Sequence, residues 1–153
     1  MKLDLDCVRD VMLCAEENTG YRNNCVFIDP VDAEKEAKFL DVKPPEPAEY
    51  QKTLTDKYGL DMFLYHVNYC IQAGLLCADE HTLSYQFVIL DLTPYGHQFL
   101  ENIRPASMWE IVKSSLLKAG STSLKLTTTV AENVASQFIS NFLMNGLPQM
   151  KLF

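Results

Sequence analysis

The sequence predicts an α+β fold: a winged helix-turn-helix with a C-terminal helical hairpin extension. Helical and strand-like patterns follow one another as helix, short strand, helix, helix and β-hairpin, which is the order of a winged helix-turn-helix. Capping residues and helix breakers fall between these segments. The length of 153 residues, with 48% hydrophobic and 22% charged residues, fits one domain with an appendage and excludes a disordered acidic tail. We therefore expect a winged-helix domain over residues 1–104, with residues 29–57 inserted, and a helical extension over residues 105–153.

The first element is an amphipathic helix over residues 4–18, with Asp4 as its N-terminal cap. Its inward residues recur at intervals of three and four: Leu5, Val8, Val11, Met12 and Ala15. The β-rich run of residues 25–28 follows and predicts the first strand of a sheet.

The inserted segment opens with Asp29 and Pro30, a capping residue followed by proline at the first helical position. We expect the helix that they start to run to about Leu40. Residues 43–47 (KPPEP) form a stiff break that no helix crosses, and a further short helix is expected from the last of these prolines through Leu54.

The clearest helix lies over residues 60–73 and ends at Gly74, which is placed to adopt the left-handed conformation after a helix. Its predicted inward face consists of Leu60, Phe63, Leu64, Val67 and Ile71. Residues 75–77 and 83–92 are β-rich and flank the polar stretch 78–82, so that they predict a β-hairpin with a long loop.

Thr93 and Pro94 cap and start the next helix, which Arg104 and Pro105 end. Its predicted inward residues are Tyr95, Phe99, Leu100 and Ile103. Ser107 followed three residues later by Glu110 has the spacing of a capping box, which predicts another helix from Ser107 to about Gly120.

The last helix is expected over residues 123–146. Its apolar stripe consists of Leu126, Val130, Val134, Phe138, Ile139 and Phe142, and it continues into Leu143, Leu147, Met150 and Phe153. So much apolar surface near a chain end is typical of an interface, and we therefore expect a homodimer or higher assembly.

Three stretches of the sequence resemble a family of small uncharacterised bacterial and prophage proteins, DUF2513. They are the opening MKLDLDCVRDVML, residues 65–76 (YHVNYCIQAGLL), and residues 92–104 (LTPYGHQFLENIR) followed by Trp109. The resemblance covers the start of the chain and residues 60–120. It implies a winged-helix fold and a bacterial or phage setting, and it implies no catalytic residues, because the family carries no established activity.

Charge is distributed unevenly along the chain. Residues 58–103 contain no Lys or Arg and carry a formal charge of -5, as do residues 1–57, whereas residues 104–153 carry +3, which gives the total of -7. A predicted recognition helix and hairpin without any cation are unusual for a protein that holds phosphates.

The outer face of the 60–73 helix is the candidate partner-binding site. It carries Met62, Tyr65, His66, Asn68, Tyr69 and Gln72. Aromatic and methionine side chains are adaptable interface residues, and a cation-free surface favours a protein partner that is itself basic. We therefore expect a non-catalytic regulatory or adaptor module, of phage or prophage origin, that acts through protein–protein contact.

Two alternatives to this interpretation stay open. One is a DNA-binding transcriptional regulator, in which Asn68 and Gln72 read bases and the positive C-terminal part or a second subunit supplies phosphate contacts. The other is that residues 29–57 or the C-terminal helices cover this face within the monomer.

Metal binding and catalysis are not expected. His66, Cys70, Cys77 and His81 are zinc-ligand types, but their spacing matches no zinc finger or ribbon. A Cys70–His66 pair lacks an orienting third group, and the chain has no phosphate-binding loop or HExxH motif. His97 is expected to pack or cap. We therefore predict no enzyme activity and no cofactor.

The compartment follows from the N-terminus and the thiols. The opening residues lack the basic and apolar regions of a signal peptide, and no apolar run is long enough to span a bilayer. Five cysteines without a CxxC motif are typical of reduced thiols, so we expect a cytoplasmic protein with no membrane contact.

Overall fold

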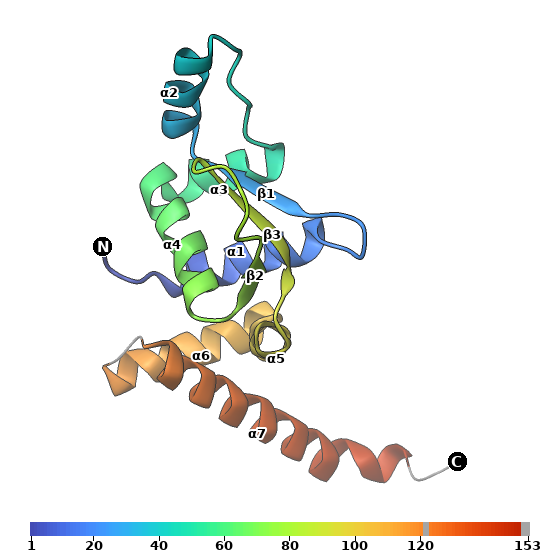
Figure 1. Ribbon diagram of the computed structural model, residues 1–153. Helices are drawn as coiled ribbons and strands as arrows, with labels where there is room; N and C mark the ends of the chain where they lie inside the picture. Colours follow the sequence, from blue (N-terminus) through green and yellow to red (C-terminus); the bar gives the residue numbers. More distant parts are fainter. Residues whose placement is uncertain (121–122, 151–153) are drawn as a thin grey trace. The chain divides into compact units, whose positions relative to one another are not determined.

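The computed structural model of the chain is shown in Figure 1 and describes residues 1–120 and 123–150. Helices and strands follow the predicted order and confirm the α+β class. The elements are α1 (Leu5–Asn18), β1 (Cys25–Ile28), α2 (Pro30–Leu40), α3 (Glu49–Tyr58), α4 (Leu60–Gln72), β2 (Leu76–Ala78), β3 (Gln86–Leu92), α5 (Pro94–Ile103), α6 (Ala106–Ala119) and α7 (Leu124–Met150). The chain divides into two compact units, Met1–Gln98 and a second that begins at Phe99.

The sheet of the first unit is antiparallel, with β3 between β1 and β2. Cys25 pairs with Ile89, and the β2–β3 pairing is interrupted by an irregularity between Cys77 and Ala78. Helices α3 and α4 lie between β1 and β2 in the sequence, and α4 leads directly into the β2–β3 hairpin. This order of helices and strands is consistent with a winged helix-turn-helix.

An aromatic cluster forms the centre of the first unit. The ring of Phe27 on β1 makes edge-to-face contacts with Phe63 of α4, at 5.1 Å between centroids, and with Tyr50 of α3, at 5.9 Å. Helix α1 packs against both α4 and β3, and all five of its predicted inward residues are buried. Asp4 caps α1 as expected, accepting a hydrogen bond from the backbone N–H of Cys7.

Side chains from α3 cover the outer edge of β1. The Tyr50 hydroxyl accepts from the N–H of Val26 at 2.9 Å and donates to the Val26 carbonyl at 3.0 Å. The Gln51 amide does the same for Ile28, at 2.8 Å and 2.6 Å. An unpaired strand edge is a template for pairing with other chains, and α3 occupies this one as a neighbouring strand would.

The second unit is built around the packing of α6 on α7. Its buried side chains on these helices are Met108, Trp109, Val112, Leu116, Thr127 and Ala131. Among the described residues, no helix is long and apolar enough to cross a membrane.

Several predicted boundaries need correction. The capping box at Ser107 is wrong, because α6 begins at Ala106 with Pro105 as its N-cap, and Ser107 therefore lies inside the first turn. The last helix does not end at residue 146 but continues to Met150, so a single glycine does not stop a helix that neighbouring residues continue. The second strand of the hairpin begins at Gln86 rather than at residue 83.

Candidate functional site

Helix α4 follows α3 after a single residue, Gly59, whose φ of +84° lies in the region that favours glycine. The buried residues of α4 are Phe63, His66, Val67 and Cys70. The predicted inward residues Leu60, Leu64 and Ile71 are only half-buried. The helix is therefore rotated about its axis relative to the predicted orientation.

Because of this rotation, the six residues predicted to bind a partner differ in how far their side chains are exposed. Tyr65, Asn68 and Gln72 are exposed, and Met62 and Tyr69 are half-buried. The prediction for His66 is wrong, since its side chain is fully buried.

His66 connects α4 to the start of α1. Its Nε2 accepts a hydrogen bond from the backbone N–H of Asp4 at 2.8 Å, and Nδ1 lies 2.7 Å from the carbonyl oxygen of Met62. Because Nε2 is an acceptor, the proton is assigned to Nδ1, which donates to Met62. Backbone groups thus engage both ring nitrogens, and neither is free for a partner or a metal ion.

A third tyrosine lies beside the two on α4. Burial raises the pKa of Tyr69, and nearby Cys70, Tyr95 and Tyr65 raise it further. Tyr65 is 42% exposed and Tyr95 is 38% exposed. The prediction that Tyr95 faces inward is therefore wrong.

Gly96 explains the position of Tyr95. The buried stripe of α5 begins at Gly96 and continues through Phe99, Leu100 and Ile103, which is the i, i+3, i+4, i+7 spacing of one helix face. A Cβ on Gly96 would collide with the carbonyl oxygen of Leu75, so only glycine permits this approach. Tyr95, one position earlier, is turned outward.

Thr93 stabilises the same contact between the start of α5 and the segment around Leu75. Its hydroxyl donates to the carbonyl of Gly74 at 2.5 Å and accepts from the N–H of Gly96 at 2.9 Å, capping α5. The LTPYGH stretch is therefore a packing and capping motif. His97 is half-exposed and lies 3.6 Å from the Asp91 carboxylate, in an arrangement with no nucleophile.

We call the surface formed by Tyr65, Tyr69 and Tyr95, together with Asn68 and Gln72, the tyrosine face. It lies within residues 58–103, which contain no Lys or Arg. Tyr65, Asn68, Gln72 and Tyr95 remain exposed although α3 of the inserted segment packs against α4, and α2 projects from the first unit (Figure 1).

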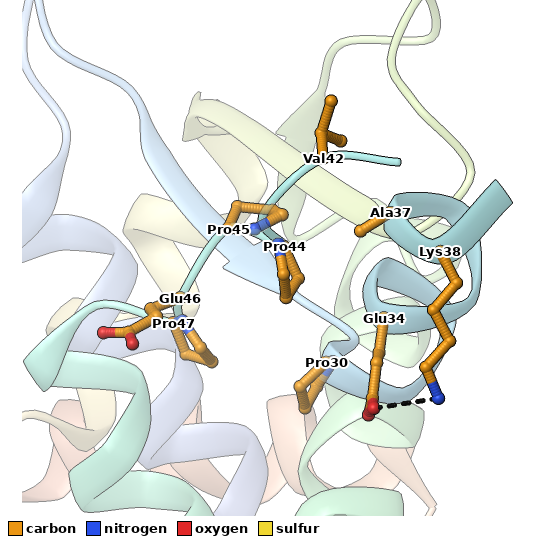
Figure 2. Close-up of a pocket in the computed structure, with 9 residues that line it drawn as sticks. All are labelled: Pro30, Glu34, Ala37, Lys38, Val42, Pro44, Pro45, Glu46 and Pro47. Atoms are coloured by element: carbon orange, nitrogen blue, oxygen red, sulfur yellow. Dashed lines mark ion pairs between the residues drawn. The ribbon is translucent and has the colours of Figure 1, made fainter. Parts of the chain in front are cut away.

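The inserted segment instead forms a hollow of its own, shown in Figure 2. Its volume is about 350 Å³, and it lies between α2 and the proline-rich stretch of residues 42–47. Its polar lining includes Glu34 and Lys38, which pair with each other at 3.3 Å. Prolines make up much of the remaining wall, so the hollow gathers no group of catalytic side chains.

Two thiols meet between α1 and β1. Cys14 hydrogen-bonds the sulfur of Cys25, which lowers the pKa of Cys25 and raises that of Cys14. The Cys14 sulfur also accepts from the Asn18 amide at 3.7 Å. Cys14 lines a groove of about 310 Å³ between α1 and α3. The Glu17 carboxylate lines the same groove and raises the pKa of Cys14 further.

The zinc-ligand types are also unsuited to a shared site. His66 has both nitrogens engaged, Cys70 is fully buried, and Cys77 and His81 are exposed. Over residues 1–120 and 123–150, no three His, Cys, Asp or Glu side chains come together to hold a metal ion.

The comparisons with known proteins give one finding. No curated protein and no solved structure matches the chain. A family model described as "Hypothetical protein (DUF2513)" matches residues 2–122, which is most of the chain and includes the tyrosine face. The chain therefore belongs to the DUF2513 family.

Proposed function

We propose that this chain is a non-catalytic regulatory or adaptor module that binds another protein through the tyrosine face. The observation that carries the proposal is that three partly exposed tyrosines come from two helices of a stretch, residues 58–103, that contains no Lys or Arg. Tyrosines supply large, rigid contact area at low entropic cost and are enriched among residues that dominate binding energy.

The chemistry of this face favours a basic partner. Residues 58–103 carry a formal charge of -5, so their field attracts cationic surfaces and repels acidic ones. Arg and Lys side chains of a partner can also lie over exposed tyrosine rings, an interaction worth about 0.5–1 kcal/mol at exposed sites.

The experiment is affinity capture from the native host, comparing wild type with a Tyr65→Ala/Tyr69→Ala double variant. Each truncation at a binding hot spot costs about 2 kcal/mol or more, so we expect at least about a thirtyfold loss of partner affinity. Tyr21→Ala is the matched control, because Tyr21 is fully exposed and lies outside the tyrosine face. Half of each sample is treated with nuclease, so that capture through nucleic acid is recognised.

The result that contradicts this proposal is equal loss of capture in Tyr21→Ala and in the double variant. Loss of folding in the double variant would contradict it as well, since both side chains are partly exposed. Circular dichroism of the two variants distinguishes these outcomes.

The alternative is a DNA-binding regulator, and one observation favours it. Helix α4 follows α3 after the Gly59 turn, precedes the β2–β3 hairpin, and exposes Asn68 and Gln72, which are base-reading residue types. The test is fluorescence anisotropy with duplex DNA over a salt series. Sub-micromolar binding near physiological salt that is lost in Asn68→Ala would favour this alternative over a protein partner.

We further propose a cytoplasmic location and a phage or prophage origin. The location is supported by the five cysteines, all of which are free thiols, as is usual in reducing compartments. The origin is supported by the resemblance to bacterial and prophage proteins of the family. The homodimer predicted from the last helix is also a proposal, and α7 gives it a defined surface.

A further inference from the structure

Helix α7 is much longer than the helix on which it packs. It has 27 residues, whereas α6 has 14, and the difference corresponds to about 20 Å at a rise of 1.5 Å per residue. Thr127 and Ala131, in its first two turns, are fully buried. The later turns extend beyond the length of its partner helix.

The face that α7 buries in its first half continues, exposed, in its second half. Ala131 is followed by Ala135, Phe138 and Phe142 at intervals of three and four, so these residues share one face. Yet Phe138 is 62% exposed and Phe142 is 54% exposed. Ile139 and Leu143 widen this face with further exposed apolar area, whereas Met144 lies on the other side of the helix.

This surface is uncharged. Residues 133–145 contain no Asp, Glu, Lys or Arg. A helix that binds anionic lipid surfaces or nucleic acid normally carries Lys or Arg beside its apolar face. A partner of either charge would also gain no ion pair here. An uncharged apolar face is instead compatible with a copy of itself, as an isologous interface requires.

The exposed area of this face is more than half of what one partner in a dimer buries. At roughly 200 Å² for each fully exposed large side chain, the exposed fractions of its four large residues, Phe138, Ile139, Phe142 and Leu143, amount to about 440 Å². A standard interface buries about 800 Å² per partner. The groove beside these residues and the flanking residues of α7 supply the remainder.

A groove beside the stripe provides a place for a side chain of the partner. Its volume is about 280 Å³, and it lies between the start of α6 and the middle of α7. Pro105 and Met108 form one wall, and Ala135, Phe138 and Ile139 form the other. Glu101, Asn102 and Ser107 add polar groups to the rim, and the Glu101 carboxylate is paired with Arg104 at 3.3 Å. An aromatic ring fits such an apolar groove, and the apolar surface near it is shielded from water by the same contact.

We propose that the second half of α7 binds the same segment of a second copy of this chain, with an aromatic side chain of each copy entering the groove of the other. The interface is separate from the tyrosine face, so it does not depend on the proposed partner protein. It turns the chain into a two-fold assembly that presents two tyrosine faces.

The test is light scattering of the full chain over a concentration series, with Phe142→Glu compared with Gln137→Glu. Gln137 is exposed and lies on the side of α7 opposite the middle of the face formed by Phe138, Ile139, Phe142 and Leu143, so the control adds the same charge outside that face. We expect wild type and Gln137→Glu to have twice the 17.4 kDa chain mass. We expect Phe142→Glu to raise the dissociation constant by at least about a hundredfold, because an isologous interface loses the contact twice.

A second variant, Phe138→Ala, keeps the proposal testable if the introduced charge disturbs folding, and circular dichroism verifies the helix content of all variants. We expect Phe138→Ala to weaken the dimer by at least about thirtyfold. A 17.4 kDa species for wild type at every concentration would overturn the proposal. A dimer that Phe142→Glu and Gln137→Glu weaken equally, or that Phe138→Ala leaves intact, would also overturn it.

Discussion

His66 shows at the scale of one residue why the orientation of α4 could not be predicted from the sequence. Two stripes on this helix have helical spacing, one containing Leu60, Leu64 and Ile71 and the other containing His66 and Cys70. Hydrophobicity favours the first, but the structure buries the second. The deciding partner is the N–H of Asp4, which lies 62 positions away in the chain. No local pattern reports such a contact.

Replacing His66 with Ala should destabilise the fold. The substitution leaves the Asp4 N–H without its acceptor and creates a cavity where a fully buried ring stood, which together cost about 3 kcal/mol. Urea unfolding measures this change. His81→Ala is the control, because His81 is exposed and its substitution should change the unfolding free energy by less than about 0.5 kcal/mol. A His66→Ala variant as stable as wild type would show that the ring is not a structural link.

At the scale of elements, α3 has a role that the sequence did not indicate. The pattern predicted only a short helix through Leu54, whereas α3 extends to Tyr58 and covers the edge of β1. Consecutive residues of α3, Tyr50 and Gln51, serve alternate residues of the strand. The strands, caps and helix order were predictable because they depend on neighbours in the sequence. The edge cover was not, because it depends on a contact between a helix and a strand more than 20 residues apart.

The substitution Gln51→Ala should therefore lower the free energy of unfolding by more than the size of the removed side chain suggests. Gln51 is almost fully buried, and its loss leaves both the N–H and the carbonyl of Ile28 without partners, for about 2–4 kcal/mol in total. Gln51→Glu keeps the acceptor but opposes a carboxylate oxygen to the Ile28 carbonyl, so it should be destabilising as well. Lys52→Ala, which removes only an exposed ion pair, is the control and should cost less than about 1 kcal/mol. Equal unfolding free energies for Gln51→Ala and Lys52→Ala would contradict the edge-cover role.

At the scale of the whole molecule, the candidate site was predictable in part. Tyr65, Asn68, Tyr69 and Gln72 were found from the helix pattern and have partly or fully exposed side chains. Tyr95 was missed, since its exposure depends on the close packing of Gly96 against Leu75. The two compact units divide within α5, between Gln98 and Phe99, whereas the breaker at Arg104 and Pro105 marks where the helix ends.

The five cysteines are spread over the first unit, and the reactivity of their thiols should differ by position. Cys77 is exposed, whereas Cys7 and Cys70 are fully buried. Burial, with Asp4 and Asp10 nearby, raises the pKa of Cys7 from 9.0 to about 12. Its thiolate fraction is then about a thousandfold smaller at a given pH below 9, and only the thiolate reacts.

We therefore expect one fast thiol in the native chain. With a colorimetric disulfide reagent near neutral pH, Cys77 should react first because it is exposed, and Cys7 and Cys70 should react only as the chain opens. The pKa of Cys25 is lowered by the hydrogen bond from Cys14, but Cys25 is buried, so its reaction also requires opening. In denaturant all five should react, because none is in a disulfide. Cys77→Ser should remove the fast phase and leave four thiols in denaturant. Two fast thiols in the native chain would contradict the packing of α1 against α4 and β3, and fewer than five in denaturant would contradict the free-thiol state.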